Sequence, residues 1–135
     1  MQRFILADTG PLYARAMRRD AEHERAMREL TTLEGEGYRV LLAQLIVLET
    51  HKLLLRRNPS PFAHVYTLAL TERFHTINPL SDDYRAGMTA IRRFKDQKLS
   101  LFDATLAALS KRLITPVWTF DHHFDVLGVP VWRPS

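Results

Sequence analysis

The stretch RFILADTGP, residues 3–11, sets the fold class of this chain. Its mostly apolar first half, 3–7, predicts a buried strand, and Pro11 favours the first position of a helix, where a missing N–H has no partner to lose. A strand that turns directly into a helix is typical of parallel sheets, whose strands are joined by helical crossovers. Asp8 stands at this turn, beyond the carboxyl end of the strand, where open parallel sheets bind their ligands.

The rest of the chain continues this alternation of strands and helices. Further strands are expected at 38–43, 74–77, 117–120 and, as a short closing strand, 129–132. Helices are expected at 11–19, 21–34, 45–57, 62–72, 81–94 and from residue 100 to the break at 115–116. We expect Ser81 to cap the helix that begins there. We therefore predict an α/β fold: a single domain over residues 1–135, with helices covering both faces of a mostly parallel sheet.

Composition limits the class of protein. The chain has 135 residues, 46% hydrophobic and 25% charged, which is ordinary for a soluble globular domain. It has no cysteine, which excludes disulfides, thiolate zinc sites and cysteine nucleophiles. No segment reads as a signal peptide or membrane span, so we expect a cytoplasmic protein with no membrane association. The net charge of +4 permits nucleic acid or an acidic protein as a partner without distinguishing them.

Four acidic side chains lie in or beside apolar segments: Asp8, Glu49, Asp103 and Asp121. Three of them have a structural explanation. Asp8 could cap the helix at Pro11, Asp103 could complete a capping box three residues after a serine, and Asp121 could begin a turn. Taken singly, these three acids therefore leave a structural and a functional role open.

Glu49 is harder to explain by stability alone. It shares an apolar helix stripe with Ile46 and Leu53, and carboxylates are rarely left in such surroundings without a partner. An ion pair within its own helix could reach only Lys52 or Arg56. A ligand role is favoured for this residue.

A divalent cation explains all four acids together, because a parallel sheet would gather them at one edge. Oxygen ligands without cysteine suit Mg²⁺ or Mn²⁺ rather than zinc, as one or two ions. Asp125 is a candidate fifth carboxylate. The adjacent His122 and His123 are expected to point different ways on a turn, so we assign them a structural or substrate-contacting role rather than a zinc site.

Four segments, in order and context, resemble the PIN-domain family, and within it the VapC-type toxins of toxin–antitoxin pairs. They are ILADTGPL at 5–12, the helix with Glu49, LFDATL at 101–106 and TFDHHF at 119–124. The resemblance implies a three-layer α/β/α domain with about five strands, and an Mg²⁺- or Mn²⁺-dependent endoribonuclease. It also implies a homodimer that is held inactive by a cognate antitoxin.

The resemblance also assigns roles to particular residues. The catalytic and metal-binding residues would be Asp8, Glu49, Asp103 and Asp121, with supporting roles for Thr9, Thr119 and Asp125. Hydrolysis of RNA by metal-activated water would leave a 5′-phosphate and a 3′-hydroxyl.

Four basic residues are candidate contacts to RNA phosphates: Arg56, Arg92, Arg93 and Lys98. Each of them could equally belong to a helix face that is simply exposed to solvent.

Two alternative functions remain open. The protein could be a PIN nuclease that is not a toxin, or a PIN-like binding module without activity. A phosphoacceptor receiver domain is disfavoured, because no Lys follows the 117–120 strand. A haloacid-dehalogenase-type phosphatase is also disfavoured, because Gly10 stands where it would need a second Asp.

Overall fold

A computed structural model describes residues 2–135 of the chain. Within this range the strands form one four-stranded sheet in the order β3-β2-β1-β4. The strands are β1 (Arg3–Ala7), β2 (Tyr38–Ala43), β3 (His75–Ile77) and β4 (Val117–Trp118). Every neighbouring pair is parallel, as the alternation in the sequence predicts. The predicted α/β class is confirmed. The sheet has four strands, close to the predicted number of about five.

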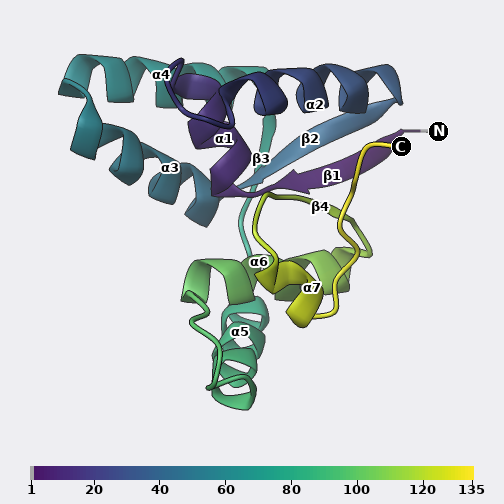
Figure 1. Cartoon of the computed structure of the whole chain (residues 1–135). Helices are drawn as coiled ribbons and strands as arrows, with labels where there is room; N and C mark the ends of the chain where they lie inside the picture. The colour runs from purple at the N-terminus through teal and green to yellow at the C-terminus, as the bar shows by residue number, and fades with distance from the viewer. Residues whose placement is uncertain (1) are drawn as a thin grey trace.

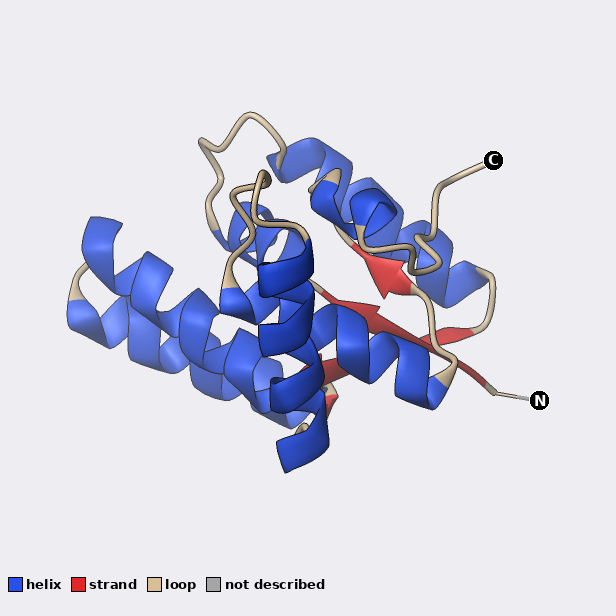
Figure 2. Cartoon of the chain, turned by 90° about the horizontal axis from the view of Figure 1, so that it is seen from below, coloured by secondary structure: helices blue, strands red, loops and turns tan. Residues whose placement is uncertain are grey.

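Seven helices accompany these strands over residues 2–135. They are α1 (Thr9–Ala16), α2 (His23–Gly35), α3 (Gln44–Arg57), α4 (Ser60–Arg73), α5 (Ser81–Arg93), α6 (Leu101–Leu113) and α7 (His123–Val126). Helices α2 and α4 lie above the sheet and α5, α6 and α7 below it, which makes three layers (Figure 1). Figure 2 looks onto the lower layer. No helix in the described range is long and apolar enough to cross a membrane.

Strand β1 forms the centre of the core because β2 and β4 pair with its two edges. Its residues Ile5, Leu6 and Ala7 are fully buried. A continuous apolar run of this kind is typical of a strand covered by helices on both faces. The strand therefore holds the start of α1, and with it Asp8, in a fixed position.

The expected closing strand at 129–132 is reduced to a single parallel bridge between Val131 and Val117. The Val117 N–H donates to the Pro130 carbonyl at 2.9 Å, and the Trp132 N–H donates to the Val117 carbonyl at 2.9 Å. Pro130 has no N–H to donate, so a longer ladder cannot form here.

The start of α5 differs from the prediction, because Ser81 is not the cap. The N-cap is Leu80, whose backbone N–H donates to Asp83 Oδ2 at 2.7 Å. Asp83 also accepts two hydrogen bonds, each 2.9 Å long, from the guanidinium of Arg112 on α6. A buried carboxylate at the third helical position thus both begins α5 and ties it to α6.

Candidate functional site

An open cleft of about 560 Å³ lies at the carboxyl ends of β1 and β4. The residues around it come from α1 and its N-cap, α3, α6 and its N-cap, and the loop after β4. They are Asp8, Thr9, Gly10, Tyr13, Glu49, Leu53, Ser100, Asp103, Phe120, Asp121 and His122. The structure thus places all four predicted carboxylates on one cleft.

Asp8 is the most deeply buried of these acids, with 5% of its surface exposed. It is the N-cap of α1, where Oδ1 accepts from the Thr9 N–H at 2.8 Å and Oδ2 accepts from the Thr119 hydroxyl at 2.7 Å. Burial, with the charges of Asp103 and Glu49 adding to it, raises the pKa of Asp8 to about 7, although both hydrogen bonds act in the opposite direction. Within residues 2–135, no basic side chain lowers this pKa.

Glu49 reaches the cleft from α3 and is half-buried. The Thr9 hydroxyl donates a short hydrogen bond to Glu49 Oε1, which fixes the carboxylate. Burial raises the pKa of Glu49, and the charge of Asp103 adds to this, while the Thr9 hydrogen bond and the charge of Lys52 lower it. Lys52 thus offsets the Glu49 charge only in part.

Asp103 lies in the first turn of α6, where its backbone N–H donates to the Ser100 hydroxyl at 3.1 Å. Burial raises the pKa of Asp103, as does the charge of Asp121, while hydrogen bonds with Ser100 and the charge of His123 lower it. Asp103 therefore lies at the capped start of α6, as the sequence predicts, and also borders the cleft.

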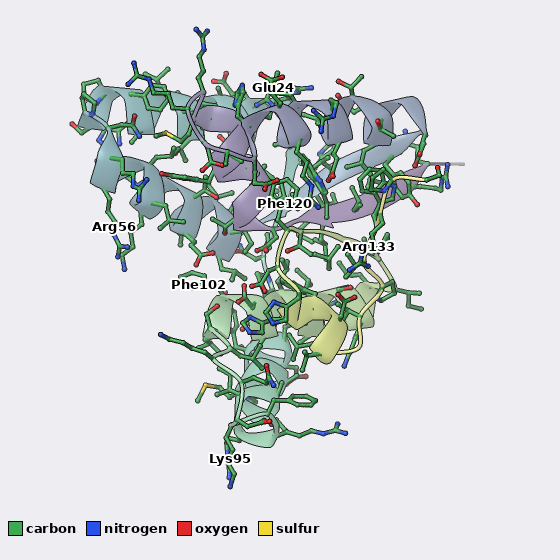
Figure 3. All side chains as sticks on the ribbon, in the orientation of Figure 1. Glu24, Arg56, Lys95, Phe102, Phe120 and Arg133 are labelled. Atoms are coloured by element: carbon green, nitrogen blue, oxygen red, sulfur yellow. The ribbon has the colours of Figure 1, made fainter. Side chains whose placement is uncertain are left out.

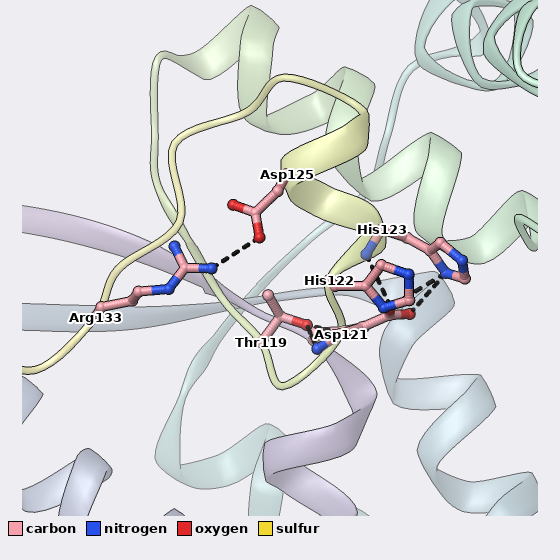
Figure 4. Close-up of polar contacts among 7 residues, drawn as sticks. Thr119, Asp121, His122, His123, Asp125 and Arg133 are labelled. Carbon is pink, nitrogen blue, oxygen red and sulfur yellow. Dashed lines mark hydrogen bonds and ion pairs between the residues drawn. The ribbon is translucent and has the colours of Figure 1, made fainter. Parts of the chain in front are cut away.

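Asp121 follows β4 and is held by its neighbours. Its N–H donates to the Thr119 hydroxyl at 2.9 Å, and its Oδ1 accepts from the His123 N–H at 2.9 Å. Both imidazoles face the same carboxylate, with Nδ1 of His123 at 3.1 Å and Nδ1 of His122 at 3.7 Å from Oδ1 (Figure 4). The expectation that the two histidines point different ways is wrong, because the start of α7 turns both rings toward Asp121.

The donor set fits a hard divalent cation. The charge of Asp103 raises the pKa values of Asp8 and Glu49, and the charge of Asp121 raises that of Asp103, so a bound cation would relieve repulsion among these acids. The donors are carboxylate oxygens, which suit Mg²⁺ or Mn²⁺. Asp8, Glu49, Asp103 and Asp121 all border this cleft and could hold such an ion there.

The remaining predicted site residues lie away from the cleft. Asp125 is exposed and binds Arg133 at 2.8 Å (Figure 4). Arg56 is exposed near the end of α3 and points outward (Figure 3). Arg92 and Arg93 line a separate surface depression of about 840 Å³.

Lys98 is exposed in the loop that leads into α6. It lies two residues before Ser100, which borders the cleft. Of the four predicted phosphate contacts, Lys98 is thus the nearest along the chain to a cleft residue.

Sequence reasoning did not identify the apolar wall of the cleft, which is formed by Tyr13, Leu53 and Phe120. The ring of Phe120 lies under the guanidinium of Arg25, 4.0 Å from its centroid. An aromatic ring that borders a cleft can stack on a nucleic-acid base. The sequence did offer one indication that Phe120 borders the site, because it directly precedes Asp121.

The sequence model of the PIN domain matches residues 5–129. No curated protein matches the chain in sequence. Among solved structures, the VapC20 sarcin–ricin loop cleaving toxin of Mycobacterium tuberculosis has a TM-score of 0.82 and 23% identity over 96% of this chain and 99% of its own. VapBC2 of Rickettsia felis has a TM-score of 0.75 and 10% identity over 96% and 97%. FitAcB of Neisseria gonorrhoeae has a TM-score of 0.67 and 21% identity over 96% and 97%.

Proposed function

Because this chain belongs to the PIN-domain family, we propose that it is a divalent-metal-dependent endoribonuclease and the toxin of a VapBC-type toxin–antitoxin pair. One observation carries the proposal. Four carboxylates from separate parts of the chain border one cleft, and no basic side chain in the described part of the chain offsets the charge of the most buried one, Asp8. Such an arrangement disfavours a purely structural role, because an uncompensated buried charge destabilises a fold.

The carboxylates supply the cation site. A bound Mg²⁺ or Mn²⁺ would lower the pKa of a coordinated water and neutralise charge that develops on the phosphodiester. Asp8, Asp103 and Asp121 would hold the principal ion, and Glu49 would orient the attacking water or help to hold a second ion. Attack by water breaks the P–O3′ bond, which gives a 5′-phosphate and a 3′-hydroxyl.

Two threonines position these acids. The Thr119 hydroxyl donates to Asp8 and accepts from the backbone of Asp121, so it fixes the separation of the two. The Thr9 hydroxyl donates to Glu49. Carboxylates that are locked by neighbouring hydrogen bonds lose little entropy when an ion binds.

The proposed substrate is an RNA whose phosphates contact the basic surface and whose base stacks on the cleft wall. Phe120 offers an aromatic face there, and Lys98 precedes the helix that carries Asp103. The similar VapC20 is a sarcin–ricin loop cleaving toxin, which makes that RNA loop a reasoned first substrate to test. Arg56, Arg92 and Arg93 are proposed as outer phosphate contacts.

The proposed protein partners are an antitoxin and a second copy of the chain, in the cytoplasm. Several similar structures are toxin–antitoxin complexes, including VapBC-1 of Haemophilus influenzae and a complex from Klebsiella pneumoniae. A small neighbouring reading frame whose product binds and inhibits this chain would support the toxin assignment. A nuclease without such a neighbour would be a PIN nuclease of another kind.

The decisive experiment measures cleavage of a sarcin–ricin loop RNA and an unstructured RNA in Mg²⁺, in Mn²⁺ and in EDTA. Wild-type protein is compared with Asp8→Asn and with the matched control Asp82→Asn, whose carboxylate is exposed and paired with Arg85 outside the cleft. We expect cleavage by wild type and Asp82→Asn in either metal, and none by Asp8→Asn or in EDTA.

Two outcomes would contradict the proposal. Cleavage that persists in EDTA or in Asp8→Asn would exclude the metal-nuclease mechanism. Binding of RNA without cleavage in either metal would favour the alternative of a PIN-like binding module.

A further inference from the structure

The two histidines beside Asp121 form a cluster with a chemistry that the four carboxylates do not have. Asp121, His122 and His123 each offer one ligand atom, and these atoms all lie within 4.8 Å of one another. Within residues 2–135, no other group of three or more acidic and histidine side chains meets that condition. Two of its three donors are imidazole nitrogens.

Two distances in this cluster match the edges of a coordination polyhedron. Asp121 Oδ1 lies 3.1 Å from His123 Nδ1 and 3.7 Å from His122 Nδ1. With metal–ligand bonds of about 2.1 Å, these separations correspond to ligand–metal–ligand angles of about 95° and about 125°. Those angles bracket the tetrahedral value, and the two imidazole nitrogens lie within 4.8 Å of each other, so a turn of the exposed His122 ring would let one ion contact all three atoms.

The surroundings allow an ion to reach the cluster. The side chain of His122 is 77% exposed and borders the open cleft, so its ring is free to turn. His123 is 17% exposed, and its backbone N–H holds the Asp121 carboxylate in place. Arg133, which borders the same surface pocket as Asp121 and His122, is already paired with Asp125 (Figure 4).

We propose that Asp121, His122 and His123 bind a transition-metal ion of the zinc class. Two imidazole nitrogens and one carboxylate oxygen favour Zn²⁺, Co²⁺ or Ni²⁺ over Mg²⁺, and the fourth position is left to water. The site requires both histidines to carry their proton on Nε2, which leaves Nδ1 free to coordinate.

This site is separate from the proposed nuclease chemistry except that both use Asp121. Zinc bound by the histidines would engage the Asp121 carboxylate and withdraw it from the carboxylate site. Zinc should therefore inhibit cleavage that Mg²⁺ supports, and removal of His122 should relieve the inhibition. The metal binding itself can be measured on a protein with no activity, so the two proposals can fail independently.

The test titrates chelator-stripped full-length protein with Co²⁺, followed by visible absorption, and with Zn²⁺ in competition with a chromophoric chelator. The variants are His122→Ala, His123→Gln and Asp8→Asn. The matched control is His51→Ala, which removes one of a stacked histidine pair on α3 and α4. Thermal unfolding without metal establishes that each variant is folded.

We expect one Zn²⁺ per chain in wild type, His51→Ala and Asp8→Asn, and an affinity at least about tenfold weaker in His122→Ala and His123→Gln. Co²⁺ should give a visible spectrum typical of nitrogen ligands, which His122→Ala alters. Unchanged Zn²⁺ affinity in folded His122→Ala would overturn the proposal. Loss of Zn²⁺ binding in Asp8→Asn would also overturn it, because the ion would then belong to the carboxylate site.

Discussion

The Thr119 hydroxyl donates a 2.7 Å hydrogen bond to Asp8, a residue 111 positions earlier in the chain. The same hydroxyl accepts a 2.9 Å hydrogen bond from the backbone N–H of Asp121. One buried side chain at the end of β4 therefore connects the acid that follows β1 to the acid of the next loop.

Removal of this hydroxyl should weaken both the fold and the proposed activity. Thr119→Val keeps the shape of the side chain but leaves Asp8 Oδ2 without its donor, so we expect a loss of about 1–3 kcal/mol in unfolding free energy. The rate of RNA cleavage should fall about tenfold or more, because the two acids lose their common support. Urea unfolding and single-turnover cleavage measure these effects. Thr89→Val is the control, since the Thr89 hydroxyl bonds only within its own helix; an equal loss in the control would contradict the explanation.

The stability of the metal-free protein should fall as pH rises from about 4 to about 7. The pKa of Asp8 is about 7 in the folded chain against an ordinary value of 3.8, so the folded state holds a proton that the unfolded state has lost in this window. This difference corresponds to at most about 4 kcal/mol. The raised pKa values of Glu49 and Asp103 act in the same direction.

Asp8→Asn isolates the contribution of that residue. It should stabilise the metal-free protein at pH 7.5 and flatten its pH dependence, as measured by urea unfolding from pH 4.5 to 7.5. Mg²⁺ should stabilise wild type and not the variant. A variant that is less stable than wild type at pH 7.5 without metal would contradict the assigned pKa.

The close approach of α5 and α6 should make Gly87 intolerant of a side chain. A Cβ at this position would lie 2.8 Å from Thr105 Oγ1 and 3.0 Å from the Thr105 backbone nitrogen. We expect Gly87→Ala to lower the unfolding free energy by about 1–3 kcal/mol, even though alanine favours a helix by about 1 kcal/mol. Gly35→Ala is the matched control, because a Cβ added there would have no described neighbour within 4 Å outside its own helix. It should be neutral or stabilising, and an equal loss in both variants would remove the packing explanation.

The basic residues should contribute to RNA binding through charge rather than shape. Substitution of Arg92, Arg93 or Lys98 by alanine should weaken binding to unrelated single-stranded RNAs alike and reduce the salt slope by about 0.7 for each lost contact. The control is Arg85→Ala, whose guanidinium is paired with Asp82. Binding measured on an inactive Asp8→Asn background avoids cleavage. An unchanged salt slope would contradict the prediction and would mean that these side chains are exposed to solvent without contacting RNA phosphates.

The sequence was sufficient to predict the parts of the fold that depend on local pattern. The apolar run at 3–7 and the turn through Asp8 predicted parallel strands joined by helices. Glu49 was proposed as a ligand because its own helix offered few basic partners, and the structure places it on the cleft. Strand β2 was predicted with the bounds that the structure has.

Features that depend on distant residues could not be predicted in this way. Asp83, not Ser81, organises the start of α5, because Arg112 binds it from 29 residues further along the chain. The facing imidazoles at Asp121 depend on the four-residue helix α7, which is too short to leave a periodic pattern. The predicted closing strand at 129–132 does not form beyond a single bridge, because Pro130 cannot donate a backbone hydrogen bond. The apolar pattern of this segment gave no indication of that loss.

The central claim is that the carboxylate cleft hydrolyses RNA with a metal-activated water, and cleavage in ¹⁸O-labelled water tests it most directly. RNA is cut to completion by wild-type protein in Mg²⁺, and the new ends are analysed by mass spectrometry. The account predicts one ¹⁸O atom on a 5′-phosphate and an unlabelled 3′-hydroxyl. A 2′,3′-cyclic phosphate with a 5′-hydroxyl, formed by attack of the ribose, would contradict it.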